Sequence, residues 1–161
     1  MNTKYAGFWP RLVAIVIDLI ILGIAQSFII VPILGVMGLG FLGNMGEMDM
    51  SDSENIVGMI GAIIAMAGTY WILATSVRIL YFSFMESSNS QATLGKMAMG
   101  LVVTDMNGGK LDFGKAFVRN ICKIISDFTC LIGYVIAGFT EKKQALHDII
   151  AGTLVMKKAS A

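Results

Sequence analysis

The segment that decides the fold is LVAIVIDLIILGIAQSFIIVPILGVMGLGFLGNMG, residues 12–46, in which Asp18 is the only charged residue. A helix needs about 20 apolar residues to cross the hydrocarbon core of a bilayer. The segment therefore predicts a transmembrane helix over about residues 12–36, loosened afterwards by closely spaced glycines. An ionisable group at membrane depth costs at least a few kcal/mol and usually persists only with a partner or a purpose. We expect Asp18 to face protein, in a buried polar centre.

A second apolar segment spans residues 56–84, and its only charge is Arg78 near the end. The composition agrees with a membrane protein: 56% of the 161 residues are hydrophobic and 14% are charged, against about 25% charged in a soluble domain. The net charge of +1 gives no overall field that would attract nucleic acid.

Lysines and arginines flank the two spans unequally. Lys4 and Arg11 precede the first span and several basic residues end or follow the second, whereas the acidic loop at 44–55 has none. By the positive-inside rule, the N-terminus and segment 86–117 are cytoplasmic and the loop is extracytoplasmic.

A third membrane element, at about residues 118–139, has two interpretations. In the first it is a full span that carries Lys123 and Asp127 inward. In the second it is an interfacial helix followed by a short re-entrant helix, because the apolar stretch 128–139 is shorter than a crossing requires. The basic tail favours a cytoplasmic end and hence the second interpretation, but both remain open.

The segment after the second span has β character. Residues 101–104, with three β-branched side chains, are a predicted strand. Asn107-Gly108 suits the positive φ angles of a hairpin turn, and residues 111–113 are the predicted returning strand. Residues 153–156 are a candidate third strand. The expected fold is an all-α membrane protein in one domain, residues 1–161. It has two full transmembrane helices, a third full or re-entrant helix, amphipathic interfacial helices and a small cytoplasmic β-hairpin.

The sequence gives no positive sign of catalysis. Lys96 follows Gly95 but lacks the rest of a P-loop, and His147 is the only histidine, which rules out the usual His-based zinc sites. Two cysteines, Cys122 and Cys130, form no CxxC motif and are expected to be reduced apolar fillers. We expect no enzyme activity, no cofactor and no metal.

Four motifs occur in order along the chain: YAGFWPRL at 5–12 followed by Asp18, TLGKMAMGLVV at 93–103, the stretch 108–119, and QALHD at 144–148 followed by AGTLV at 151–155. Together they resemble the RDD family of bacterial membrane proteins, which is named for one arginine and two aspartates. The resemblance places these at Arg11, Asp18 and Asp148. The stretch between Arg119 and Lys142 is shorter than in many members. The resemblance implies a multi-pass protein of the bacterial cytoplasmic (inner) membrane, for which a role in transport has been proposed.

Arg11, Asp18 and Asp148 are therefore the expected polar centre, with Lys96, Arg119, Asn120 and His147 as supporting polar residues. The expected function is a small transporter or channel-like subunit that moves a cation, a proton or a small solute past this centre. Because two or three spans enclose no pathway alone, this function requires a homo-oligomer in the lipid bilayer. The alternative is a non-transporting scaffold or accessory protein that binds a partner through its cytoplasmic segments.

Two contacts are predicted within the polar centre. Arg119 and Lys123, with Asn120 as a neutral alternative, are the expected partners of Asp18. Arg11 is seven residues from Asp18, too far for contact along one helix, so Asp148 is its expected partner. The competing interpretations are that Arg11 extends to the interface and that Asp148 caps a helix.

Overall fold

A computed structural model describes residues 5–45, 52–128 and 140–158. The chain forms two units. One contains residues 1–21 together with 79–161, and the other contains residues 22–78.

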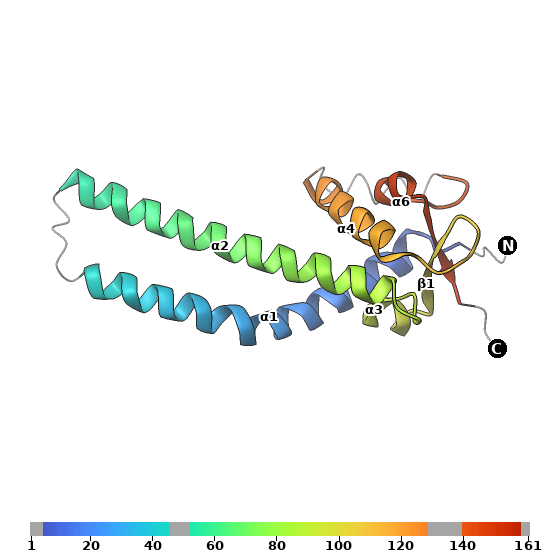
Figure 1. Ribbon diagram of the computed structural model, residues 1–161, viewed down its shortest axis with the longest axis horizontal. Coiled ribbons are helices and arrows are strands. Elements are labelled where there is room, and N and C mark those ends of the chain that lie inside the picture. The colour runs from blue at the N-terminus through green and yellow to red at the C-terminus, as the bar shows by residue number, and fades with distance from the viewer. Residues whose placement is uncertain (1–4, 46–51, 129–139, 159–161) are drawn as a thin grey trace. The chain divides into compact units, whose positions relative to one another are not determined.

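The second unit consists of the C-terminal part of one long helix, α1 (Phe8–Met45), and the N-terminal part of another, α2 (Ser53–Glu86), drawn in blue and green in Figure 1. Both are long and apolar enough to cross a membrane. Large apolar side chains such as Phe28 and Val57 are 77% and 69% exposed, as expected of a surface that contacts lipid. Within this unit, Gln26 Nε2 donates a hydrogen bond to the carbonyl of Ala74 at 2.9 Å.

The helix α1 includes Pro32 and the glycines that follow it, and it ends at Met45 instead of near residue 36. The expected loosening near Val36 was wrong. In a membrane there is no water to bind backbone N–H and C=O groups, so these groups must form hydrogen bonds within the helix. Apolar surroundings therefore preserve a helix that glycines would weaken in water.

A small antiparallel sheet lies in the first unit. Strand β1 (Leu101–Asp105) pairs with β2 (Thr153–Lys157), in a register that places Leu101 opposite Lys157. The start of the chain adds to it, since the N–H of Ala6 donates to the carbonyl of Val155 at 2.9 Å. The prediction that residues 153–156 pair with residues 101–104 is confirmed.

The expected hairpin was wrong in its other strand. The turn forms, with Gly108 at φ +84° and its N–H bonded to the carbonyl of Asp105 at 3.2 Å. Residues 111–113 form no strand, because the carboxylate of Asp112 accepts the N–H of Gly114 at 2.9 Å and starts a helix, α4 (Phe113–Phe128). The sheet is therefore closed by a distant segment instead of a local hairpin.

Each strand follows a short helix and a left-handed glycine. Helix α3 (Leu94–Ala98) precedes Gly100 at φ +62°, and α6 (Leu146–Ala151) precedes Gly152 at φ +61°. Lys96 and Asp148 occupy the same place in these two helices, four residues before the glycine. The two helix–glycine–strand segments thus carry opposite charges at matching positions.

The core of this unit is formed by small and branched side chains from six segments of the chain: Ala6, Ala14, Leu101, Val103, Leu111, Ala116 and Val155. Helix α4 covers the first part of the predicted third membrane element, and residues 129–139 lie outside the described residues. Of the helices that the structure describes, only α1 and α2 have the length and hydropathy of a membrane span.

Candidate functional site

Asp18 is fully buried and accepts hydrogen bonds from three donors. Tyr81 Oη donates at 3.0 Å, Thr93 Oγ1 at 2.5 Å and the N–H of Gly95 at 2.8 Å. Three donors satisfy most of the hydrogen-bonding capacity of a carboxylate. Asp18 therefore ties α1 to the end of α2 and to α3.

The close approach of α3 to α1 depends on Gly95. A Cβ atom at this position would lie 2.1 Å from the carbonyl oxygen of Ala14 and 2.9 Å from Cγ of Asp18. Thr93 begins α3 as its N-cap, because Thr93 Oγ1 also accepts the N–H of Lys96 at 3.4 Å. Thr93 and Gly95 thus supply two of the donors to Asp18 and allow α3 to pack closely against α1.

The prediction that Asp18 faces protein is confirmed, but its predicted partners were wrong. Arg119, Asn120 and Lys123 all bind Glu86, a fully buried residue at the end of α2. Asp18 instead accepts hydrogen bonds from neutral donors at the end of α2 and the start of α3.

Glu86 is surrounded by cations from two helices. Lys96 Nζ and Lys123 Nζ both contact Glu86 Oε1, the latter at 3.2 Å, and Arg119 Nη1 lies 2.6 Å from Oε2. Asn120 Nδ2 donates to Oε2 at 3.1 Å and to Ser83 Oγ at 3.4 Å. One carboxylate thus holds α2, α3 and α4 together.

Asp148 is the second anchor of this network. Arg119 Nε and Nη2 lie 2.8 and 2.7 Å from Asp148 Oδ1, and Arg11 Nη1 bonds to Oδ2. The predicted pair of Arg11 and Asp148 is confirmed, with Arg11 only 6% exposed. The carboxylate also accepts the N–H of Ala145 at 3.1 Å at the start of α6, so Asp148 has both of the roles considered for it.

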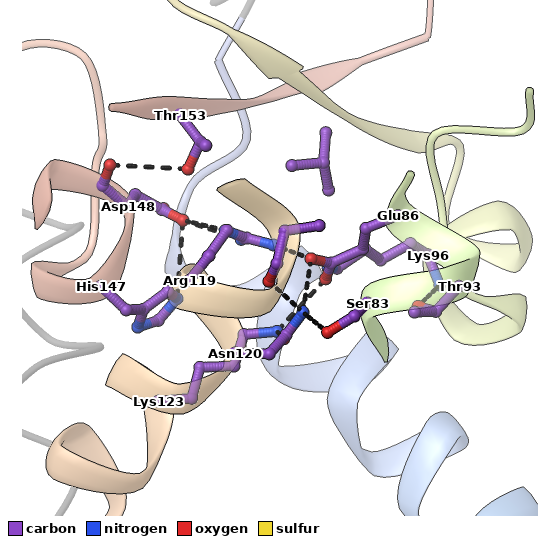
Figure 2. Close-up of polar contacts among 12 residues, drawn as sticks. Ser83, Glu86, Thr93, Lys96, Arg119, Asn120, Lys123, His147, Asp148 and Thr153 are labelled. Atoms are coloured by element: carbon purple, nitrogen blue, oxygen red, sulfur yellow. Dashed lines mark hydrogen bonds and ion pairs between the residues drawn. The ribbon is translucent and has the colours of Figure 1, made fainter. Parts of the chain in front are cut away.

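Arg119 joins the two anchors, as Figure 2 shows, because it lies between Asp148 and Glu86. His147 also contacts Asp148, with its Nε2 atom 3.5 Å from Oδ1. We call this set the charged cluster. It comprises Arg11, Glu86, Lys96, Arg119, Lys123, His147 and Asp148, all of which are buried.

Burial and neighbouring charges shift the protonation of the cluster. Burial raises the pKa of Asp148, but the charges of Arg119 and Arg11 and the hydrogen bond from Arg11 outweigh it and hold this pKa well below the usual range. Burial lowers the pKa of His147 well below 6.5, and Asp148 opposes this only in part. Asp148 is therefore ionised and His147 is neutral at pH 7.

Sequence reasoning found most of these residues and missed Glu86, Tyr81 and Thr93 as members of the site. Glu86 ends a long apolar helix beside a polar linker, where an acid is usually solvated. The sequence feature that points to a buried Glu86 is the excess of basic residues that follow it, since buried cations require a counter-charge.

The helices α1 and α2 have the length and apolar composition of membrane spans, and the start of α1 and the end of α2 belong to a unit in which buried charges form an intramolecular network. The sequence profile of the RDD family matches residues 5–152. The chain belongs to the RDD family.

Two relatives cover nearly the whole chain. An uncharacterized protein, YxaI, of Bacillus subtilis (strain 168) is 33% identical over 155 residues, which are 96% of this chain and 99% of the relative. An uncharacterized membrane protein, YteJ, of the same organism is 27% identical over 157 residues, 97% of this chain and 83% of the relative. No solved structure matches the chain.

Proposed function

We propose that the chain is a subunit of a small membrane transporter or channel, in which a proton, a cation or a small solute moves past the charged cluster. The observation that carries this proposal is the burial of seven ionisable side chains in the unit that contains the start of α1 and the end of α2. Ionisable groups near membrane depth are costly and commonly mark ion or proton pathways.

A proton is the cargo that the cluster fits best. Four cations surround the site, namely Arg11, Lys96, Arg119 and Lys123, and they disfavour the entry of a free cation. His147 is neutral in the folded state and lies 3.5 Å from Asp148, so it can accept a proton whose charge a carboxylate then stabilises.

The proposed assembly is a homo-oligomer in the bacterial inner membrane with a cytoplasmic N-terminus. Two long helices enclose no pathway by themselves, and their apolar side chains are exposed along most of their length. The pairing of β1 with β2 supports placing both strands on one side. The chain between them then makes an even number of full crossings, which favours the re-entrant form of the third element.

Reconstitution tests the transport proposal. Liposomes that contain the purified protein are assayed for proton flux with an internal pH dye and for potassium and sodium flux with ion-selective dyes. We expect proton flux above protein-free liposomes, a severalfold loss in His147→Gln, and no loss in Lys115→Met, because Lys115 is exposed on α4. Flux equal to that of protein-free liposomes for all three ions would contradict transport.

The second candidate function is a non-transporting scaffold, and the geometry of Asp18 favours it. This carboxylate is fully buried and accepts hydrogen bonds from three donors, as expected of a purely structural residue. A scaffold would bind its partner through the segment 86–117 and the tail. A carboxyl-reactive probe distinguishes the two candidates at Asp18: modification from solution supports a pathway, and protection supports the scaffold.

A further inference from the structure

A small cavity of about 20 Å³ lies within the charged cluster. Its polar lining consists of Arg11, Lys96, Arg119, Lys123 and His147. Two aliphatic side chains, Ile15 and Val155, complete the lining. Neither Glu86 nor Asp148 contributes to it, so every charged side chain that lines this cavity is a cation.

The carboxylates around the cavity do not balance these cations. Glu86 and Asp148 are the two acids that contact the four basic residues. Asp18 is also buried, but its oxygens bind Tyr81, Thr93 and Gly95. Among the described residues, the cluster therefore contains two more basic side chains than carboxylates, and burial without a further counter-charge lowers the pKa of Lys123 well below its usual range. Buried charges without counter-charges are strongly unfavourable.

Hydrogen-bond donors remain available beside the cavity. Within the described part of the chain, Lys96 Nζ donates one hydrogen bond, to Glu86, although an ammonium has three N–H groups. Arg119 Nη1 lies 2.6 Å from Glu86 Oε2 without the alignment of a hydrogen bond, and it has no hydrogen-bond partner among the described residues. Burial lowers the pKa of Lys96, and Glu86 offsets this only in part. An additional acceptor would stabilise both groups.

We propose that this cavity binds one monovalent inorganic anion of about the size of chloride. A cavity of about 20 Å³ has room for about one water-sized occupant, which suits a halide and excludes sulfate or an organic anion. The anion would accept N–H groups of Lys96 and Arg119 and reduce the excess of positive charge. The site is independent of the proposed transport, because a resident anion would stabilise the cluster whether or not anything moves through the membrane.

Thermal unfolding of the full chain in detergent tests the proposal. At constant ionic strength, gluconate is replaced stepwise by chloride, bromide or sulfate. A ligand that binds only the folded state raises its stability with the logarithm of concentration above the dissociation constant. We expect chloride and bromide to raise the unfolding midpoint saturably, and gluconate and sulfate to have no such effect.

Two variants localise the effect. Lys123→Met removes one lining cation but leaves Glu86 in contact with Lys96 and Arg119, and we expect the half-saturating chloride concentration to rise by about tenfold or more, which corresponds to about 1.4 kcal/mol of binding free energy. Lys115→Met removes an exposed cation from the same helix and should leave the chloride dependence unchanged.

A direct measurement does not depend on variants. Crystals of the unmodified chain grown with bromide should show an anomalous scattering peak between Lys96, Lys123 and Arg119. The absence of this peak, or an equal chloride effect in wild type and Lys123→Met, would overturn the proposal.

Discussion

Glu86 is the residue on which the charged cluster depends most. Its two oxygens contact Lys96, Arg119 and Lys123, and it is fully buried. Removing one partner from a buried charge network leaves the other charges uncompensated, which typically costs about 3–5 kcal/mol. The cluster is thus a structural necessity at the level of single side chains, whatever else it does.

Glu86→Gln should therefore destabilise the protein by about 3–5 kcal/mol in denaturant unfolding, because the cluster loses its main counter-charge. Glu54→Gln is the matched control, since Glu54 is exposed in the first turn of the same helix, and it should change stability by no more than about 0.5 kcal/mol. Equal stability of the two variants would show that the cations around Glu86 are neutralised elsewhere.

His147 should make stability depend on pH. The folded state holds the pKa of this imidazole well below 6.5, whereas the unfolded chain binds the proton near pH 6.5. The unfolded state thus binds more protons below that pH, so stability falls as pH decreases, by at most about 1.4 kcal/mol for each pH unit, and this contribution is complete above about pH 6.5.

His147 is the only histidine, so His147→Gln should reduce this slope between about pH 6.5 and 5, where carboxylates in an unfolded chain are still mostly ionised. The measurement is the unfolding midpoint of both proteins across the pH range. Parallel profiles would mean that the folded protein binds the proton as readily as the unfolded chain.

At the scale of elements, the docking of α3 on α1 should fail when residue 95 gains a side chain. Gly95→Ala places Cβ 2.1 Å from a backbone oxygen of α1, so α3 must move and Asp18 must lose its contact with the N–H of residue 95. We expect a loss of at least about 2 kcal/mol and a lower unfolding midpoint.

Gly58→Ala is the control for Gly95→Ala, because nothing lies within 4 Å of a Cβ at residue 58 in α2. Alanine is favoured over glycine in a helix by about 1 kcal/mol, so this variant should be neutral or more stable. A tolerated Gly95→Ala would show that α3 does not pack against Ala14.

The elements differ in how well their sequences predict them. Two spans follow from apolar length, because this signal is local to each segment. The partner of β1 depends on contacts between distant segments, and Asp112 started a helix where a strand was expected. The donors to Asp18 include a backbone N–H and a phenol, and neither has a spacing that sequence could reveal, whereas the opposite charges of Arg11 and Asp148 indicated their pairing.

At the scale of the whole molecule, the sheet predicts which segments share a side of the membrane. Gly100 accepts the N–H of Lys158 at 2.7 Å, and Gln91 accepts the N–H of Val103 at 2.7 Å, so residues 90 and 158 should lie on one side. In a background with Cys122→Ala and Cys130→Ala, a membrane-impermeant thiol reagent applied to intact cells should label Asp49→Cys alone. Ser90→Cys and Lys158→Cys should react only after permeabilisation. Labelling of Lys158→Cys from outside would mean that the sheet does not form in the membrane.

The pairing of Arg11 with Asp148 joins residues 137 positions apart, and this separation bears on how the protein is made. Arg11 leaves the ribosome near the beginning of translation, whereas its counter-charge is added only after both long helices have been synthesised. During that interval the nascent chain carries an arginine at the start of its first membrane helix that no carboxylate from α6 can yet neutralise. The start of the first helix thus gains its counter-charge only from the last part of the chain. Chains that end before Asp148 should leave Arg11 without this partner and be degraded by membrane proteases.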